Sequence, residues 1–220
     1  ALREGIGDRL AEGVMRAAPG LGADAATRAV HGRSGNTPLS HDHRRFWPYL
    51  FDVSIAEGGS SDLHVFPLPG RFGVADFSSP YAADEVVDYV VRVKGVSPFI
   101  DSLGVCRQPN REVMEILLEM LRAATGWQFT APEALDVGLR ALTLMRLFNL
   151  RAGVDPATYA PSARYGSAPP DGAAAGHSIH PAFAEMRRRY YTGMGWHPET
   201  GRPLPETLKK LGLESAIAEL

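Results

Sequence analysis

The chain has 220 residues, of which 45% are hydrophobic and 22% charged, and its 23 basic and 25 acidic side chains give a net charge of −2. These values are typical of a globular protein with a proper core, and the balanced charge disfavours nucleic acid and anionic membrane surfaces as partners. A single cysteine excludes an internal disulfide, and no apolar run approaches the ~20 residues of a spanning helix, so we expect a cytoplasmic chain.

The first predicted element is a helix over residues 2–18, ended by Pro19 and Gly20. One apolar stripe of this helix should face a core, because apolar residues recur at every fourth position. Residues 20–80 show no sustained period, so we predict irregular structure with one short helix in the apolar stretch 46–55. A helix over 81–94 follows, with acidic residues near its start and basic residues near its end, as the helix dipole favours.

The middle of the chain predicts two consecutive helices. The first extends from Asn110, a suitable N-cap, to Gly126 and has one wide apolar face. The second covers about 131–149 behind a capping box formed by Thr130 and Glu133. It is apolar on nearly every side, which predicts a central helix.

The last third of the chain predicts a long loop and two further helical segments. Residues 151–180 are rich in Pro, Ala and Gly and are too long for a simple connection, so they form a candidate lid or interface segment. Helical periodicity returns over 181–192, and again over 205–220 with an interruption at Gly212. The fold class is therefore all-α, an irregular helical array with long loops. The core should include two tryptophans, Trp127 and Trp196.

Three residue types that bind cofactors meet in residues 101–106, between two predicted helices and just after an apolar, strand-like run. The Asp101 carboxylate can accept hydrogen bonds from the N–H groups of a pterin or purine edge. Gly104 permits close approach of the backbone to a flat ligand, and the Cys106 thiolate can bind iron or another soft metal. The segment is also an ordinary turn sequence, and a lone cysteine is often a small buried hydrophobe, so both alternatives stay open.

This segment resembles the second of the two Asp-x-x-Gly-Leu-Cys-type pterin-binding motifs of the aldehyde ferredoxin oxidoreductase family. The resemblance covers nearly all of the chain from Gly5 onward, with the poorest agreement over about 45–100. Each further matching segment is weak, but all fall in the order of that family. They are residues 5–13, 30–32, 41–44, 125–127, 138–140, 146–153, 161, 190–191, 195–196, 201–203 and 211–213.

The resemblance implies that residues 1–220 form the C-terminal helical region of that family, as one unit or as two interleaved subdomains, without the N-terminal pterin and iron–sulfur domain. It implies that Cys106 is the fourth ligand of a 4Fe–4S cluster whose other three cysteines lie in that missing domain, since a cluster needs about four such ligands. It further implies contacts from the turn to a tungsten or molybdenum bis-pterin, made by Asp101, Ser102, Leu103, Gly104 and Val105.

The implied activity is the oxidation of an aldehyde to a carboxylate, with electrons passing through the cluster to ferredoxin. Some relatives reduce acids or thioesters, so substrate and direction stay open. The chain alone should be inactive, because most cluster ligands lie elsewhere. The alternative is a helical binding or structural subunit that kept the fold without the metal centre. The presence of both Asp101 and Cys106 argues against it.

Histidines give weaker candidates. His64 lies in a stretch that resembles the one where relatives place a histidine beside the metal, which implies a catalytic role in proton delivery. The preceding residues 57–59 depart from the Arg-containing sequence of many relatives, so a hydrogen-bonded loop histidine is the alternative. His41 and His43 could share a metal, but no further ligand completes the set and a solvated loop is favoured. We assign the basic run 187–189 to a salt-bridged helix face and not to nucleic acid.

Overall fold

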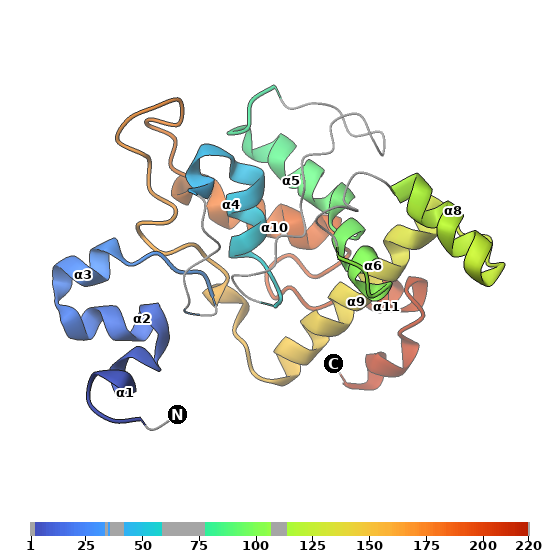
Figure 1. The fold of residues 1–220 in the computed structure, drawn as a ribbon, viewed down its shortest axis with the longest axis horizontal. Coiled ribbons are helices and arrows are strands. Elements are labelled where there is room, and N and C mark those ends of the chain that lie inside the picture. The colour runs from blue at the N-terminus through green and yellow to red at the C-terminus, as the bar shows by residue number, and fades with distance from the viewer. Residues whose placement is uncertain (1–2, 34, 36–41, 59–77, 107–113, 220) are drawn as a thin grey trace.

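The computed structural model describes residues 3–33, 35, 42–58, 78–106 and 114–219. Within these ranges the regular structure is helical, apart from one isolated antiparallel bridge between Trp196 and Pro203, which confirms the all-α class. Figure 1 shows α4, α5, α6 and α10 grouped at the centre, α1 to α3 at one end and α8 at the opposite end. The elements are α1 (Ile6–Leu10), α2 (Gly13–Ala17), η1 (Ala18–Leu21), α3 (Ala23–Arg28), η2 (His43–Arg45), α4 (Trp47–Ser54), α5 (Ala83–Val93), α6 (Val96–Ser102), α8 (Met114–Thr125), α9 (Ala131–Arg151), η3 (Pro156–Thr158), α10 (His180–Gly193), α11 (Pro205–Lys210) and η4 (Glu214–Glu219).

The main core lies between α4, α5, α6, α9 and α10. The predicted helices 46–55, 81–94 and 181–192 are confirmed as α4, α5 and α10. Helices α5 and α10 bury the residues that their period places on one face, whereas α4 is buried on nearly every side. Edge-to-face contacts join Phe51 of α4 to Phe183 and Tyr190 of α10, with ring centroids 5.7 and 5.9 Å apart. These three predicted helices therefore supply much of the core.

Helix α9 begins with the predicted capping box. The Thr130 side chain accepts from the Glu133 amide at 3.4 Å, and the Glu133 carboxylate accepts from the Thr130 amide at 2.8 Å. The helix extends to Arg151, two residues beyond the predicted end. Its predicted central position is confirmed for one side of the helix and wrong for the other. Leu142 is fully buried, whereas Leu144 and Phe148 are 47% and 71% exposed.

The predicted single helix over 2–18 is wrong. It divides into α1 and α2, because Gly13 has a φ of +75°, a left-handed conformation that a continuous α-helix cannot contain. Its expected apolar stripe does not reach a core either, since Ile6 and Leu10 are 65% and 63% exposed. Helix α3 follows in a region that was expected to be irregular.

Helix α8 ends where predicted, at Gly126 with a φ of +77°, whereas the residues that would show its Asn110 cap lie outside the described ranges. The wide apolar face is wrong in part, because α8 buries Met114, Leu117 and Leu118 but leaves Ile116 and Met120 exposed. A helix that packs on one side only buries a narrower stripe than its sequence offers.

The two tryptophans assigned to the core differ in outcome. Trp196 is buried, as predicted. Trp127 is 61% exposed, so its assignment is wrong: it lies at the outer end of a row of rings, 6.2 Å from Phe129, which in turn is 6.4 Å from Phe99 of α6. Its ring is therefore covered on one side only.

The expected long loop is present between α9 and α10, with the short η3 turn inside it. Buried side chains attach it to the body of the molecule, namely Tyr159, Tyr165, Ala174 and Ile179. The last segment divides into α11 and η4 at Gly212, whose φ is +67°, so the predicted interruption is confirmed. Its leucines form a second small cluster against α9.

Candidate functional site

The candidate segment 101–106 begins inside a helix. The apolar run before it was expected to be strand-like, but it forms the body of α6. Asp101 and Ser102 therefore lie in the last helical turn. A short run of apolar residues has no period that separates a buried strand from a buried helix. The segment therefore emerges from the end of a buried helix and not from a loose connection.

The turn has the geometry of a helix C-terminus. The Leu103 amide donates to the Ile100 carbonyl at 3.1 Å, and the Gly104 amide donates to the Asp101 carbonyl at 3.0 Å. Gly104 has a φ of +71°, which glycine adopts without strain. Among the described residues, no atom outside the local chain lies within 4 Å of the position that a Cβ on Gly104 would take, so this part of the structure leaves the backbone face open to a ligand.

The polar groups of the turn are accessible. Asp101, Gly104, Val105 and Cys106 are exposed, so the interpretation of Cys106 as a small buried hydrophobe is wrong. Asp101 stands at the negative end of the helix dipole, where a carboxylate reduces helix stability. The Ser102 hydroxyl donates to the Pro98 carbonyl at 2.7 Å and serves its own helix.

The turn fits one side of a cofactor that another part of a protein completes. It offers a carboxylate acceptor, an open backbone and a thiol within six consecutive residues. Among the described residues, no group of three or more His, Cys, Asp or Glu side chains lies together as a metal site. A metal held here would thus need further ligands in addition to Cys106.

The structure separates the candidate histidines. His64 and His41 lie outside the described residues, so neither prediction is tested. His43 is 2% exposed, and its Nδ1 lies 2.5 Å from the Tyr165 hydroxyl, so the solvated loop expected for it is wrong. Burial and the charges of Asp52 and Asp42 raise the pKa of Tyr165, which keeps the phenol protonated.

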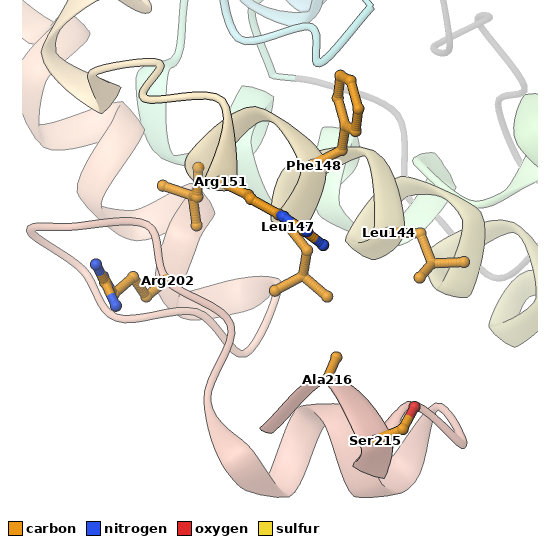
Figure 2. A pocket seen from close by; sticks show the side chains of 8 residues that line it. Leu144, Leu147, Phe148, Arg151, Arg202, Ser215 and Ala216 are labelled. Carbon is orange, nitrogen blue, oxygen red and sulfur yellow. The ribbon is translucent and has the colours of Figure 1, made fainter. Parts of the chain in front are cut away.

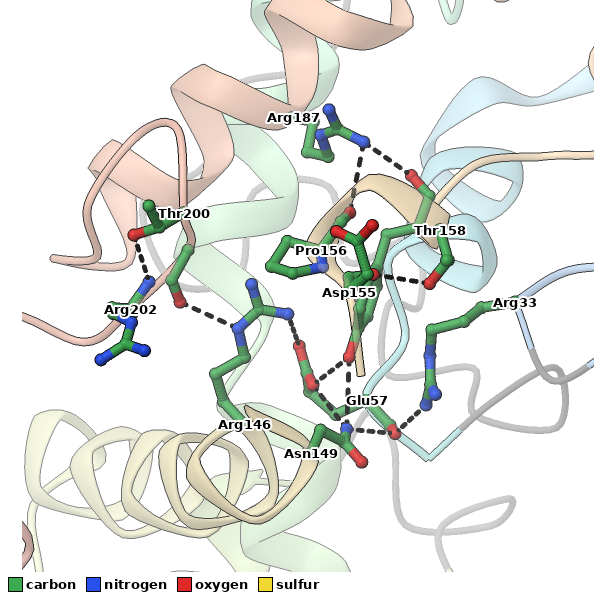
Figure 3. A network of polar contacts seen from close by, with 12 residues as sticks. Arg33, Glu57, Arg146, Asn149, Asp155, Pro156, Thr158, Arg187, Thr200 and Arg202 are labelled. Atoms are coloured by element: carbon green, nitrogen blue, oxygen red, sulfur yellow. Dashed lines mark hydrogen bonds and ion pairs between the residues drawn. The ribbon is translucent and has the colours of Figure 1, made fainter. Parts of the chain in front are cut away.

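A buried polar network that the sequence did not reveal joins α9 to two distant segments (Figure 3). Arg146 donates to a Glu57 carboxylate oxygen at 3.3 Å and to the Gly201 carbonyl at 2.9 Å. The Glu57 carboxylate also accepts from Asn149 at 2.8 Å and from the Tyr159 hydroxyl at 2.7 Å. The sequence signal that could have indicated this network is an arginine and an asparagine three residues apart on a mostly apolar helix.

Electrostatics favour a charged pair within this network. Burial is the largest single influence on the pKa of Arg146 and lowers it, but the Glu57 charge together with Tyr191 and Tyr159 outweighs burial, so the pKa is raised. Burial and then the Glu57 charge raise the pKa of Tyr159, so its phenol stays protonated and donates. The Arg146 guanidinium thus stays charged and the Tyr159 phenol stays protonated at ordinary pH.

The basic run at 187–189 lies on α10. Arg188 pairs with Glu185 at 2.8 Å and Glu199 at 2.7 Å, and Arg189 pairs with Asp84 and Asp88 of α5. The predicted salt-bridged helix face is therefore confirmed for these two arginines.

An open cavity of about 440 Å³ lies between α9 and η4 (Figure 2). Leu147 points into it towards Ala216. None of the lining residues belongs to the turn 101–106. The cavity therefore contributes nothing to the candidate site.

Residues 1–213 match the family described as "Aldehyde ferredoxin oxidoreductase, domains 2 & 3". The chain belongs to this family. It is 32% identical over 222 residues to the tungsten-containing aldehyde ferredoxin oxidoreductase of Pyrococcus abyssi. This alignment covers 99% of this chain and 36% of that protein. The protein of the same name from Pyrococcus furiosus is 30% identical over 97% of this chain and 35% of its own length.

A relative with a different name is the aliphatic sulfonate oxidoreductase WOR-like subunit of Pyrococcus furiosus, 28% identical over 99% of this chain and 34% of its own length. The chain thus spans about a third of the length of these aldehyde ferredoxin oxidoreductase relatives. The family match explains the helical array, and it places the turn 101–106 inside the matched region. In the described part of the chain, no helix combines the length and apolar character needed to cross a bilayer.

Proposed function

We propose that this chain is the C-terminal part of a tungsten- or molybdenum-pterin oxidoreductase that oxidises aldehydes to carboxylates and passes electrons through a 4Fe–4S cluster to ferredoxin. The observation that supports it is the exposed turn 101–106, which joins a carboxylate, an open backbone and a thiol in a chain matched to domains 2 and 3 of the family. The alternative is a helical binding or structural subunit that kept the fold without the metal centre.

Each residue of the turn has its own task in this proposal. The Asp101 carboxylate accepts hydrogen bonds from pterin N–H groups, and the backbone from Ser102 to Val105 lies along the pterin edge. The Cys106 thiolate is the fourth cluster ligand. The bound metal-pterin supplies the oxidation chemistry, and this chain orients it and shields it from water. The first pterin contacts and the other cluster ligands come from outside residues 1–220.

We propose an aldehyde as the substrate, because two relatives that are 30 and 32% identical to this chain are named aldehyde ferredoxin oxidoreductases. The relative named for aliphatic sulfonate is 28% identical. We further propose that residues 1–220 belong to the C-terminal helical region, as one unit or as two interleaved subdomains. The exposed apolar side chains support a large covering partner, the cofactor-bearing N-terminal region. They are Ile6, Leu10, Ile116, Met120, Trp127, Leu144 and Phe148.

Substitutions in the turn test the proposal in the assembled enzyme. Cys106→Ala should remove one iron ligand, so the cluster should be lost or reduced to a three-iron form. Asp101→Ala should instead lower the tungsten or molybdenum and pterin content while better preserving iron, because each unpaired buried donor costs ~1–3 kcal/mol. Elemental analysis, pterin fluorescence and electron paramagnetic resonance measure these losses.

The matched control is Asp171→Ala, which removes an exposed aspartate from the loop before α10. It should leave iron, metal and pterin unchanged. If Asp101→Ala and Cys106→Ala behave like this control, the turn is an ordinary helix end and the proposed function is wrong.

His64 carries a separate prediction. As the proposed proton donor beside the metal, His64→Ala should lower turnover by ~10²-fold or more, because a positioned acid or base contributes about that factor. Metal, pterin and iron content should stay constant. Steady-state kinetics with metal analysis makes the test, and His177→Ala, at an exposed histidine stacked on Tyr81, is the control. Unchanged turnover would show that His64 is a loop histidine.

A further inference from the structure

Helices α6 and α9 cross with their backbones in direct contact. A Cβ on Gly138 of α9 would lie 1.9 Å from the carbonyl oxygen of Gly95, and a Cβ on Gly95 would lie 2.6 Å from the carbonyl oxygen of Leu135. Ordinary van der Waals contact begins at 3.4 Å. Neither position can carry a side chain unless the two helices move apart.

The atom that Gly138 contacts is also the one that begins α6. Gly95 is the N-cap of α6, and its carbonyl accepts the first hydrogen bond of the helix, from the Phe99 amide at 3.1 Å. Displacement of this carbonyl must move the start of α6 or break that bond. The helix has seven residues, so its far end lies only ~10 Å away at 1.5 Å per residue. A shift at Gly95 therefore reaches the turn.

A second anchor lies directly before this crossing. Lys94 is fully buried and pairs with the fully buried Asp52 of α4. Val96, Phe99 and Ile100 of α6 are buried as well, and only the end of the helix at Asp101 and Ser102 is exposed, so its first five residues are enclosed. The position of α6 is thus fixed by α4 through Lys94 and by α9 through Gly138.

We propose that Gly138 is a positioning residue for the turn 101–106. Because it lacks a side chain, α6 lies against the α9 backbone, and this distance sets where the turn presents the Asp101 carboxylate and the Cys106 thiol. Gly138 itself does not contact the cofactor. The inference rests on the proposed function, since the place of the turn matters to the enzyme only if the turn holds the cofactor.

The position of the turn can be measured in the chain without cofactor. Cys106 is the single cysteine and is exposed, so one spin label attaches there and a second at Glu185→Cys on the exposed side of α10. Gly138→Ala should shift the mean distance between the labels by about 1.5 Å, which is the separation needed to restore ordinary contact. Gly95→Ala needs about 0.8 Å and should give a smaller shift in pulsed dipolar spectra.

The matched control is Leu208→Ala, which removes a buried side chain from the small cluster around α11 and leaves the helix crossing intact. It should lower the melting temperature, as Gly138→Ala does, without moving the labels. In the assembled enzyme, Gly138→Ala should reduce metal and pterin content by ~10-fold or more, because a misplacement of about 1 Å disrupts positioned contacts. Leu208→Ala should retain its cofactor.

The outcomes are separable. Equal label distances in wild type, Gly138→Ala and Gly95→Ala would overturn the inference, as would a shifted turn that keeps its full cofactor content. If Gly138→Ala does not fold, Gly95→Ala decides between these results with its smaller displacement. Failure of the proposed function looks different: Asp101→Ala and Cys106→Ala would keep the cofactor, while the label shift would still appear.

Discussion

Arg146→Ala should lower the free energy of unfolding by about 3–5 kcal/mol, the usual cost of removing one partner of a buried ion pair. The side chains of Arg146 and Glu57 are 0% and 1% exposed, so water cannot replace the lost guanidinium. The guanidinium also lies 4.9 Å from the ring of Tyr159 and 4.8 Å from that of Tyr191, contacts that favour a desolvated cation. Denaturant unfolding followed by circular dichroism measures the loss.

Two further substitutions separate charge from shape at this site. Arg146→Lys keeps the charge but lacks the planar fork that serves Glu57 and the Gly201 carbonyl together, so its loss should be intermediate. Gly201→Ala keeps the arginine, but its Cβ would lie 1.8 Å from the Arg146 Nη2, so it should destabilise the fold by crowding. A loss below about 1 kcal/mol in Arg146→Ala would show that the pair contributes little to stability.

The parts of the fold that the sequence predicted are those with local causes. The capping box of Thr130 and Glu133 acts within four residues, and the apolar stripe of α5 is a matter of period along one helix. Glycines at helix ends, such as Gly126, adopt a backbone conformation that few other residues accept. These signals need no knowledge of what packs against them.

The errors have non-local causes. Arg146 and Glu57 are 89 residues apart, and no pattern in either segment indicates that the two side chains pair. The exposure of Trp127 depends on which segments pack against α8 and α6. The sequence alone does not show whether another segment packs on an apolar side chain. The N-terminal helix was predicted from four apolar positions, and the left-handed Gly13 overrides that period.

The candidate site shows both behaviours. Residues 101–106 were selected because their functional side chains stand close together in the sequence, and the structure places Asp101, Gly104 and Cys106 at the surface. Their role in cofactor binding stays a prediction. The helix that holds these residues was not predicted, since the apolar run that forms α6 has no period that distinguishes a helix from a strand. The contact between Gly95 and Gly138 joins positions more than 40 residues apart, so the sequence did not reveal it either. A sequence can thus indicate which groups serve a site while the crossing that places them appears only in three dimensions.

The second large effect is expected at Lys94 and Asp52, which are both fully buried and paired beside the start of α6. Lys94→Met alone should lower the free energy of unfolding by about 3–5 kcal/mol, because it leaves the Asp52 carboxylate in the core without the ammonium group. The double variant Asp52→Leu/Lys94→Met should recover most of that loss, since an apolar pair of similar volume avoids the desolvation of both charges.

Thermal and denaturant unfolding of wild type, the single and the double variant measure this difference. The control is Arg28→Ala, which breaks a pair between two side chains that are each 77% exposed, and which should change stability by no more than about 0.5 kcal/mol. A double variant as unstable as Lys94→Met would show that Asp52 and Lys94 contribute through specific geometry and not only through mutual neutralisation. In that case the ion pair, together with the glycine crossing, would hold α6 in place.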